Sequence, residues 1–160
     1  MKCPFCGAPD TQVVDSRPVE DGFTIYRRRH CTQCNRRFTT YERREVSKMI
    51  TVIKKDNSRE PYSREKIIDG LLLATRKRPV TREKIEEIAN KVENEILSEG
   101  EKEVTSKKIG ELVLKHLRQV DAVAYVRFAS VYREFKDIEE FTLELKRLQE
   151  EEIEKRGIDG

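Results

Sequence analysis

Two short stretches, Cys3-Pro4-Phe5-Cys6-Gly7 and Cys31-Thr32-Gln33-Cys34-Asn35, decide how the first part of this chain folds. Each contains a Cys-x-x-Cys pair, and 24 residues separate the two pairs. A Cys-x-x-Cys turn places two thiolates on one side of a tight turn, and two such turns can close a tetrahedral site around Zn²⁺. Gly7 and Asn35 follow the pairs, and both residue types tolerate the left-handed conformation that such turns often require. The spacing therefore predicts one structural zinc ion, bound by Cys3, Cys6, Cys31 and Cys34.

Two alternatives to a zinc site are a redox-active dithiol and a pair of disulfide bonds. A thioredoxin-like redox site uses one Cys-x-x-Cys in a βαβ unit, whereas this chain has two pairs in a β-rich region. In cytosolic proteins, paired thiols are more often metal ligands than disulfides. Because a preformed site rarely exists in an unfolded chain, the metal should supply most of this module's folding free energy. His30 adjoins Cys31, but four thiolates already complete the tetrahedron, so we expect His30 to be a surface contact.

The composition limits the size of any core and the range of compartments. Of the 160 residues, 36% are hydrophobic and 39% are charged, which fits one ordinary domain or two small ones. No apolar run follows Met1-Lys2-Cys3, and no stretch has the pattern of a signal peptide or a transmembrane span. These features predict a cytoplasmic protein with no membrane partner.

Residues 1–46 have the pattern of a small β domain. Strand-like runs occur at residues 12–14, 23–29 and 38–43. Asp21-Gly22 is the expected hairpin turn between the first two runs. Ser47-Lys48 marks the expected boundary with the next domain.

Residues 47–137 are predicted to form a mainly helical domain with a small β-sheet at its entrance. Met49–Ile53 has the pattern of a strand, and Asp56-Asn57 follows it as a turn. Beyond this turn, apolar residues recur at spacings of three and four, which is typical of amphipathic helices. The predicted helices begin at Ser63, Thr81, Thr105 or Ser106, and Asp121.

Residues 138–160 are predicted to be a C-terminal helix and an acidic tail. Ile138, Phe141, Leu145 and Leu148 continue the helical spacing, and the acidic run starts at Glu150. The fold class is therefore α+β: a small zinc-stabilised β module, then a mainly helical domain that carries a small sheet.

Arginines cluster around the second cysteine pair. Residues 27–44 contain seven arginines and one acidic residue, and residues 1–46 hold the whole net charge of +3. In a strand, Arg27 and Arg29 share one face, and we expect the zinc site to hold Arg36 and Arg37 near that face. Such a cluster is often only a solvated charged surface. However, the absence of lysine between Cys6 and Arg44 favours planar, bidentate recognition of phosphates or base edges. The cluster predicts nucleic-acid binding by Arg17, Arg27, Arg28, Arg29, Arg36 and Arg37, without deciding between DNA and RNA.

Several uncommon motifs together resemble the NrdR family, the transcriptional repressors of ribonucleotide reductase genes. The resemblance runs from Met1 to about Phe135 and rests on motifs that agree in order and spacing. These are CPFCG, DSR at residues 15–17, RRRHC, RRFTTYER, REPYSREK at 59–66, KRPV at 77–80 and AYVRFASVYREF at 124–135. It implies a zinc ribbon that binds double-stranded operator DNA and a second part similar to an ATP cone. This implies ATP and dATP as effectors and a homo-oligomer whose size depends on the bound nucleotide.

The resemblance also implies a set of nucleotide-binding residues in the ATP cone. The positions that match are Val52, Lys54, Lys55, Glu60, Tyr62, Lys66, Ile67 and Thr105, and Tyr125 is added as a candidate for stacking on the base. Lys55 stands where arginine is usual, and it keeps the charge but not the fork of a guanidinium group. Asn57 stands where glycine is usual and still permits the turn. On periodicity alone, a tyrosine at the position of Tyr125 is more often a core residue than a base-stacking one. Lysines beside a turn are likewise more often a solvated surface than a phosphate site.

Two other classes of function compete with that of a repressor. A reductase-like enzyme would need reactive thiols, but all four cysteines are assigned to zinc, and we expect no catalytic residue. An RNA-associated or polymerase-associated zinc ribbon would explain the cysteines and arginines, but not a nucleotide-sensing domain. The sequence therefore favours a non-enzymatic, nucleoid-associated regulator in a bacterial cytoplasm.

Overall fold

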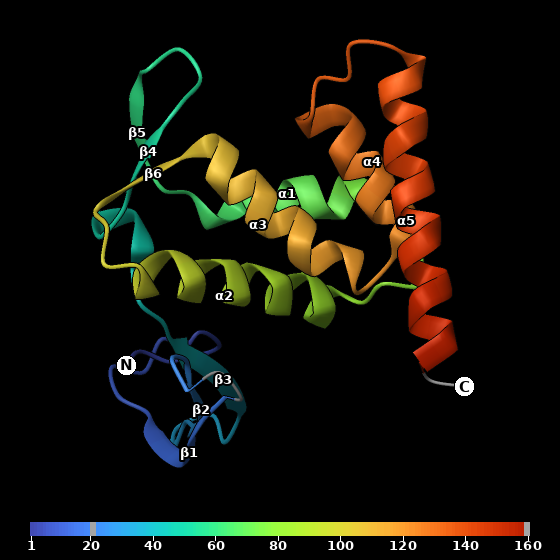
Figure 1. The fold of residues 1–160 in the computed structure, drawn as a ribbon. Helices are drawn as coiled ribbons and strands as arrows, with labels where there is room; N and C mark the ends of the chain where they lie inside the picture. The colour runs from blue at the N-terminus through green and yellow to red at the C-terminus, as the bar shows by residue number, and fades with distance from the viewer. Residues whose placement is uncertain (20–21, 159–160) are drawn as a thin grey trace. The chain divides into compact units, whose positions relative to one another are not determined.

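The computed structural model describes residues 1–19 and 22–158 and divides the chain into two compact units, Met1–Glu45 and Val46–Gly160 (Figure 1). The first unit contains three antiparallel strands in the order β1-β2-β3. They are β1 (Gln12–Pro18), β2 (Ile25–His30) and β3 (Arg37–Glu42). Strand β1 is longer than expected and contains a register shift between Val13 and Asp15. Of the hairpin turn expected at Asp21-Gly22, Asp21 lies outside the described residues, and Gly22 has a φ of 71°.

The first unit buries very little apolar surface. Its cluster of buried side chains consists of Cys3, Ala8 and Cys31, with Cys34 packed against them. Such a small core cannot by itself offset the conformational entropy lost when the chain folds. The four thiols at the centre of this unit are therefore the part on which its stability depends.

The second unit begins with the short helix η1 (Val46–Lys48) and contains a three-stranded sheet in the order β5-β4-β6. Strand β4 (Thr51–Ile53) pairs antiparallel with β5 (Arg59–Pro61) and parallel with β6 (Glu103–Thr105). A turn joins β4 to β5, and Asn57 has the expected positive φ, 65°. Of these strands, the sequence predicted only β4, because β5 and β6 are mostly polar and lack the apolar run that marks β4.

The helices of the second unit begin where the sequence predicted. They are α1 (Arg64–Ala74), α2 (Arg82–Ser98), α3 (Ser106–Arg118), α4 (Ala122–Tyr132) and α5 (Ile138–Ile158). The side chains of Thr81, Thr105 and Asp121 accept hydrogen bonds from backbone N–H groups in the first turns of α2, α3 and α4. Ser63 holds the N-cap position of α1, but its side chain makes no capping hydrogen bond. Helix α5 continues past Glu150, so the acidic run lies on a helix.

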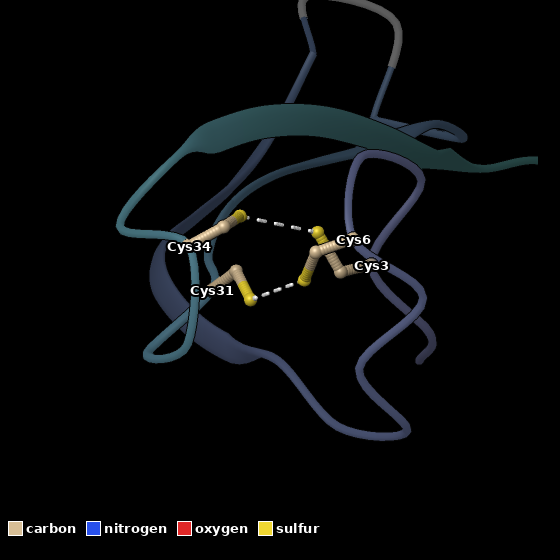
Figure 2. A group of neighbouring side chains, drawn as sticks. All are labelled: Cys3, Cys6, Cys31 and Cys34. Atoms are coloured by element: carbon tan, nitrogen blue, oxygen red, sulfur yellow. Dashed lines mark hydrogen bonds between the residues drawn. The ribbon is translucent and has the colours of Figure 1, made fainter.

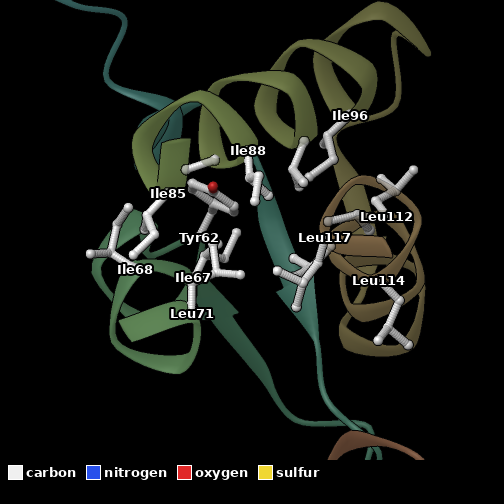
Figure 3. Close-up of a cluster of buried hydrophobic side chains, with 14 of the residues drawn as sticks. Tyr62, Ile67, Ile68, Leu71, Ile85, Ile88, Ile96, Leu112, Leu114 and Leu117 are labelled. Atoms are coloured by element: carbon white, nitrogen blue, oxygen red, sulfur yellow. The ribbon is translucent and has the colours of Figure 1, made fainter. Parts of the chain in front are cut away.

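One hydrophobic core holds these helices against the sheet (Figure 3). Leu71 of α1, Ile85 of α2 and Leu117 of α3 are at most 2% exposed, and Leu148 brings α5 into the same cluster. Complete burial of such side chains stabilises a fold by about 1.5–3 kcal/mol each. Among the described residues, no helix is both long and apolar enough to span a membrane.

A buried polar network joins the start of α1 to α2. The Tyr62 hydroxyl donates a hydrogen bond to Glu93 Oε1 at 3.0 Å, and Arg64 Nη1 forms an ion pair with Glu93 Oε2 at 3.0 Å. Tyr62 is 3% exposed and Glu93 is 8% exposed. Burial, followed by the charge of Glu93, raises the pKa of the Tyr62 hydroxyl, so this group stays neutral and donates its proton to the carboxylate.

Gly110 allows α4 to pack closely against α3. A Cβ atom at this position would overlap the ring of Tyr132, whose hydroxyl donates a hydrogen bond to the Ser106 carbonyl oxygen. We expect Gly110→Ala to lower the free energy of unfolding by about 1–2 kcal/mol, because overpacking outweighs the better helix propensity of alanine.

Gly157→Ala provides the matched control, because open space surrounds this glycine in α5. It should cause no loss of stability. Urea unfolding of both variants measures the difference, and a Gly110→Ala protein as stable as the wild type would contradict the packing argument.

Candidate functional site

Two backbone turns bring the four cysteines together in the first unit (Figure 2). All four Sγ atoms lie within 4.8 Å of one another, with Cys3–Cys34 at 3.7 Å and Cys6–Cys31 at 3.6 Å. A tetrahedral site with Zn–S bonds of about 2.3 Å has S–S edges of about 3.8 Å, whereas a disulfide bond is only about 2.05 Å long. The positive φ angles of Gly7 (76°) and Asn35 (60°) close the two turns. The geometry fits a Cys₄ zinc site.

Backbone N–H groups favour the thiolate form of Cys3 and Cys31. A hydrogen bond from the Cys34 backbone, and further ones from Gln33 and neighbouring thiols, lower the pKa of Cys31. Burial opposes the same change at Cys3, but hydrogen bonds from the Cys6 and Phe5 backbone lower its pKa to about 6. The pKa of Cys6 is raised to about 11, because desolvation and the other sulfurs outweigh a backbone hydrogen bond from Ala8. Four adjacent thiolates therefore need a cation, which Zn²⁺ supplies.

The register of the ribbon sheet places the arginines on two faces. Directly opposite residues in an antiparallel pair share a face, and Tyr26 lies opposite Tyr41, Arg28 opposite Thr39, and His30 opposite Arg37. Arg17 lies opposite Tyr26, and its guanidinium stacks over that ring at 4.9 Å. We call this surface the open face; it consists of Arg17, Tyr26, Arg28, His30, Arg37, Thr39 and Tyr41.

Arg27 and Arg29 point to the other face of the sheet. Arg27 Nη1 forms an ion pair with Glu42 at 2.7 Å, and Arg29 donates a hydrogen bond to Thr40 at 3.3 Å. The expectation that Arg37 shares their face is wrong, because the β2–β3 register aligns Arg37 with His30. Arg36 precedes β3, and its guanidinium lies 5.1 Å from the centre of the Phe5 ring.

A lysine–carboxylate cluster lies where β4, β5 and α1 meet in the second unit. Lys54 Nζ is 2.9 Å from Glu60 Oε2, and Lys66 Nζ is 2.8 Å from Glu60 Oε1. The two ammonium groups hold the pKa of Glu60 below its usual value, and Glu60 raises the pKa of Lys54. The cluster keeps a net positive charge beside the first turn of α1, where backbone N–H groups favour an anion.

The other predicted nucleotide residues occupy three different surroundings. Val52 and Ile67 are buried in the core, and Thr105 lies beside Ile53 in the sheet and caps α3. Tyr62 reaches Glu93 of α2, and the Tyr125 hydroxyl donates a hydrogen bond to Glu144 of α5 at 2.6 Å. Both hydroxyl groups thus have partners away from the lysine cluster.

Tyr125 lines a pocket of about 320 Å³ between α3, α4 and α5. Its polar walls include Arg118, Arg133, Glu111 and Glu151, which form ion pairs with one another or with Glu144. The charges of these groups are therefore largely neutralised within the protein. The Arg118–Glu151 and Arg133–Glu144 pairs hold α5 against the rest of the unit.

Sequence reasoning named Glu60 but missed the acidic partner of Lys55. Glu134 forms an ion pair with Lys55 at 3.1 Å, although 79 positions separate the two residues. Nothing in a single sequence marks such a pair, because it follows from the packing of α4 near the β4–β5 turn.

The geometry of the cysteine site predicts that the metal stabilises the first unit alone. Cys31→Ser removes a fully buried ligand, so zinc should be lost and residues 1–45 should unfold. The second unit has its own core and should keep its helical circular dichroism. Zinc analysis and amide hydrogen exchange of the two units test this expectation. Substantially less than one zinc per wild-type chain would contradict the four-thiolate site, and Ser16→Ala, an exposed change in the same unit, should leave metal content unchanged.

Both units of the chain match known protein families. Residues 1–42 match the family described as the N-terminal domain of transcriptional repressor NrdR-like proteins, and residues 50–138 match the ATP cone domain. A protein of Thermoanaerobacter sp. (strain X514) named transcriptional repressor NrdR is 53% identical over 98% of both chains. Proteins with the same name from Lachnoclostridium phytofermentans and Clostridium botulinum (strain Hall) are 54% and 53% identical, over 95% and 94% of this chain and 99% of each relative. Family matches across both units, and identity above half over nearly the whole chain, show that this protein belongs to the NrdR family of transcriptional repressors.

Proposed function

We propose that this protein represses ribonucleotide reductase genes by binding promoter DNA as a homo-oligomer whose assembly responds to ATP and dATP. The observation that carries the proposal is the presence of two sites on one chain of the NrdR family. The zinc ribbon has an exposed arginine face, and the ATP cone has a lysine cluster. The family consists of regulators and not enzymes, and a repressor of this kind acts in the cytoplasm, at the nucleoid.

The open face of the ribbon is the surface that we assign to DNA. Arg17, Arg28 and Arg37 are exposed on it, beside the exposed ring of Tyr41. Guanidinium groups can fork onto guanine edges in the major groove and neutralise phosphates. Arg27, Arg29 and Arg36 make contacts within the ribbon, and we assign them the secondary role of shaping it and of reaching phosphates at its edge.

The lysine cluster is the surface that we assign to the nucleotide. Lys54, Lys55 and Lys66 would bind the phosphates of ATP or dATP, while Glu60 holds two of these lysines in position. Thr105, Val52 and Ile67 belong to the elements that surround the cluster. Tyr62 supports α1 through Glu93, and Tyr125 supports α5, so we propose that both act indirectly.

Self-association links the two sites. A single small ribbon offers too few contacts for tight and specific binding, whereas several linked ribbons gain from a high effective concentration. Two ribbons bind one duplex well only when their spacing matches the turn of the DNA helix. A nucleotide that favours one assembly therefore changes DNA affinity without touching the arginines. We propose that dATP, the signal of sufficient deoxynucleotide, favours the DNA-binding assembly, and that ATP alone favours a non-binding one.

Substitutions on the two faces of the ribbon sheet test the DNA assignment. Arg28→Ala or Arg37→Ala should weaken binding to a reductase promoter duplex by about 1–3 kcal/mol if the residue contacts a base edge. A residue that contacts only phosphate should reduce affinity for all sequences and make the salt dependence shallower. Arg27→Ala is the matched control on the other face and should have the smaller effect.

Fluorescence anisotropy with the promoter duplex, an unrelated duplex and an RNA of equal length provides the measurement. Equal affinity of the Arg28→Ala, Arg37→Ala and wild-type proteins would remove the open face from the proposal. Preference for the RNA would favour the alternative of an RNA-associated ribbon.

The lysine cluster predicts how the regulatory switch can be broken. Lys66→Ala should weaken ATP and dATP binding by about 1–2 kcal/mol, because a hydrogen bond to a charged phosphate is lost. The variant should keep its zinc and lose nucleotide-dependent repression. Lys146→Ala, an exposed lysine of α5, is the control.

Calorimetric titration gives the affinities, and sedimentation with parallel operator binding gives the assembly in ATP and in ATP plus dATP. If the wild-type protein showed identical assemblies and identical DNA affinity in both conditions, nucleotide control of self-association would be wrong.

A further inference from the structure

Each of the three lysines assigned to the nucleotide faces a carboxylate of the protein itself. Glu60 neutralises Lys54 and Lys66 from the neighbouring strand, six residues from either lysine. Lys55, in contrast, has its carboxylate partner at Glu134, just beyond the end of α4 in the connection to α5. This ion pair therefore joins the β4–β5 turn to a distant part of the same unit.

The two carboxylates differ in how firmly they are held. Glu60 lies on β5, its side chain is 26% exposed, and each of its oxygens has a separate ammonium partner within 3 Å. Glu134 has one partner, and the side chains of Lys55 and Glu134 are 66% and 84% exposed. An exposed ion pair of this kind is weak and is screened by salt. Glu134 is thus the partner that an incoming anion can replace.

We propose that Glu134 is a competing counter-ion for the nucleotide, which the triphosphate displaces from Lys55 when it binds. A carboxylate that remained beside Lys55 would repel the phosphates, so the pair and the ligand oppose each other. The inference rests on the proposed function, because it takes the lysine cluster as the phosphate site.

Displacement of Glu134 has a structural consequence for the α4–α5 connection. The preceding residue, Arg133, forms ion pairs with Glu111 of α3 at 2.9 Å and with Glu144 of α5 at 2.9 Å. Arg133 therefore attaches the connection to α3 and α5, and Glu134 attaches it to the β4–β5 turn. Nucleotide binding releases the second of these attachments. Breaking the Lys55–Glu134 pair opposes nucleotide binding by a certain factor. By linkage, a substitution that removes the pair before the nucleotide binds should strengthen binding by that factor.

A double-mutant cycle on the full-length protein tests the proposal with Mg-ATP as the probe. Glu134→Gln keeps the size of the side chain but removes its charge, so ATP should bind about two- to fivefold more tightly. Lys55→Gln should bind ATP more weakly, and adding Glu134→Gln to that variant should give no further gain. The gain from Glu134→Gln should shrink as salt rises from about 0.05 M to about 0.5 M.

Glu139→Gln is the matched control, because it removes the same charge from an exposed position five residues further along. An equal gain from Glu139→Gln would overturn the proposal, since the effect would then be one of general charge. A gain from Glu134→Gln that persists without the Lys55 ammonium would also overturn it. Failure of the proposed function looks different: wild type and Lys66→Ala would bind ATP equally, and the counter-ion proposal would fall with it.

Amide hydrogen exchange reports the release of the connection directly. Saturation with ATP should speed exchange at residues 133–137 of the wild type. Glu134→Gln should show fast exchange there even without ATP, and Glu139→Gln should behave as the wild type does. Exchange at these residues that is unchanged or slowed by ATP would contradict the displacement of Glu134.

Discussion

The pairing of β4 with both β5 and β6 determines where the charged groups of the second unit lie. Strand β4 is only three residues long, yet it pairs with a neighbour on each side. The antiparallel pair with β5 places Glu60 opposite Val52, so that it meets Lys54 and Lys66. The parallel pair with β6 sets Thr105 beside Ile53 and thereby fixes the start of α3. This strand pairing brings three lysines and the N-termini of α1 and α3 to one small sheet.

In the first unit, a metal site and not a hydrophobic core fixes the positions of the strands. A cluster of three buried apolar side chains cannot hold three strands together, whereas a four-thiolate site ties the turn before β1 to the turn between β2 and β3. The second of these turns sets the register of β3 against β2. That register puts Arg28 and Arg37 on one face. In the proposed function the zinc ion itself makes no contact with DNA, but the site determines which arginines are exposed on the open face.

The sequence predicted correctly those features that depend on a few neighbouring residues. The cysteine spacing predicted the metal site, and the side chains of Thr81, Thr105 and Asp121 cap helices as their positions suggested. Strands β5 and β6 have no such local signature, because their pairing with β4 creates them. The face of Arg37 was wrongly expected for the same reason: alternation along a strand is local, but the alignment of two strands depends on the turn between them. The partners Glu93 and Glu134 are set by helix packing, which no short motif encodes.

The contrast between buried and exposed ion pairs indicates which parts of the ATP cone stay fixed and which can move. Loss of Arg64 from the largely buried Arg64–Glu93 pair leaves the Glu93 charge in the interior, where removal of a partner costs up to about 3–5 kcal/mol. Loss of an exposed pair such as Lys55–Glu134 costs about 0.2–1 kcal/mol. A ligand that binds with several kcal/mol can therefore exchange the exposed pair while the buried network keeps α1 in position. In the proposed function, the buried network keeps α1 and Lys66 in place while Lys55 exchanges its partner. Binding energy at the phosphates would then act on the α4–α5 connection and not on the domain as a whole.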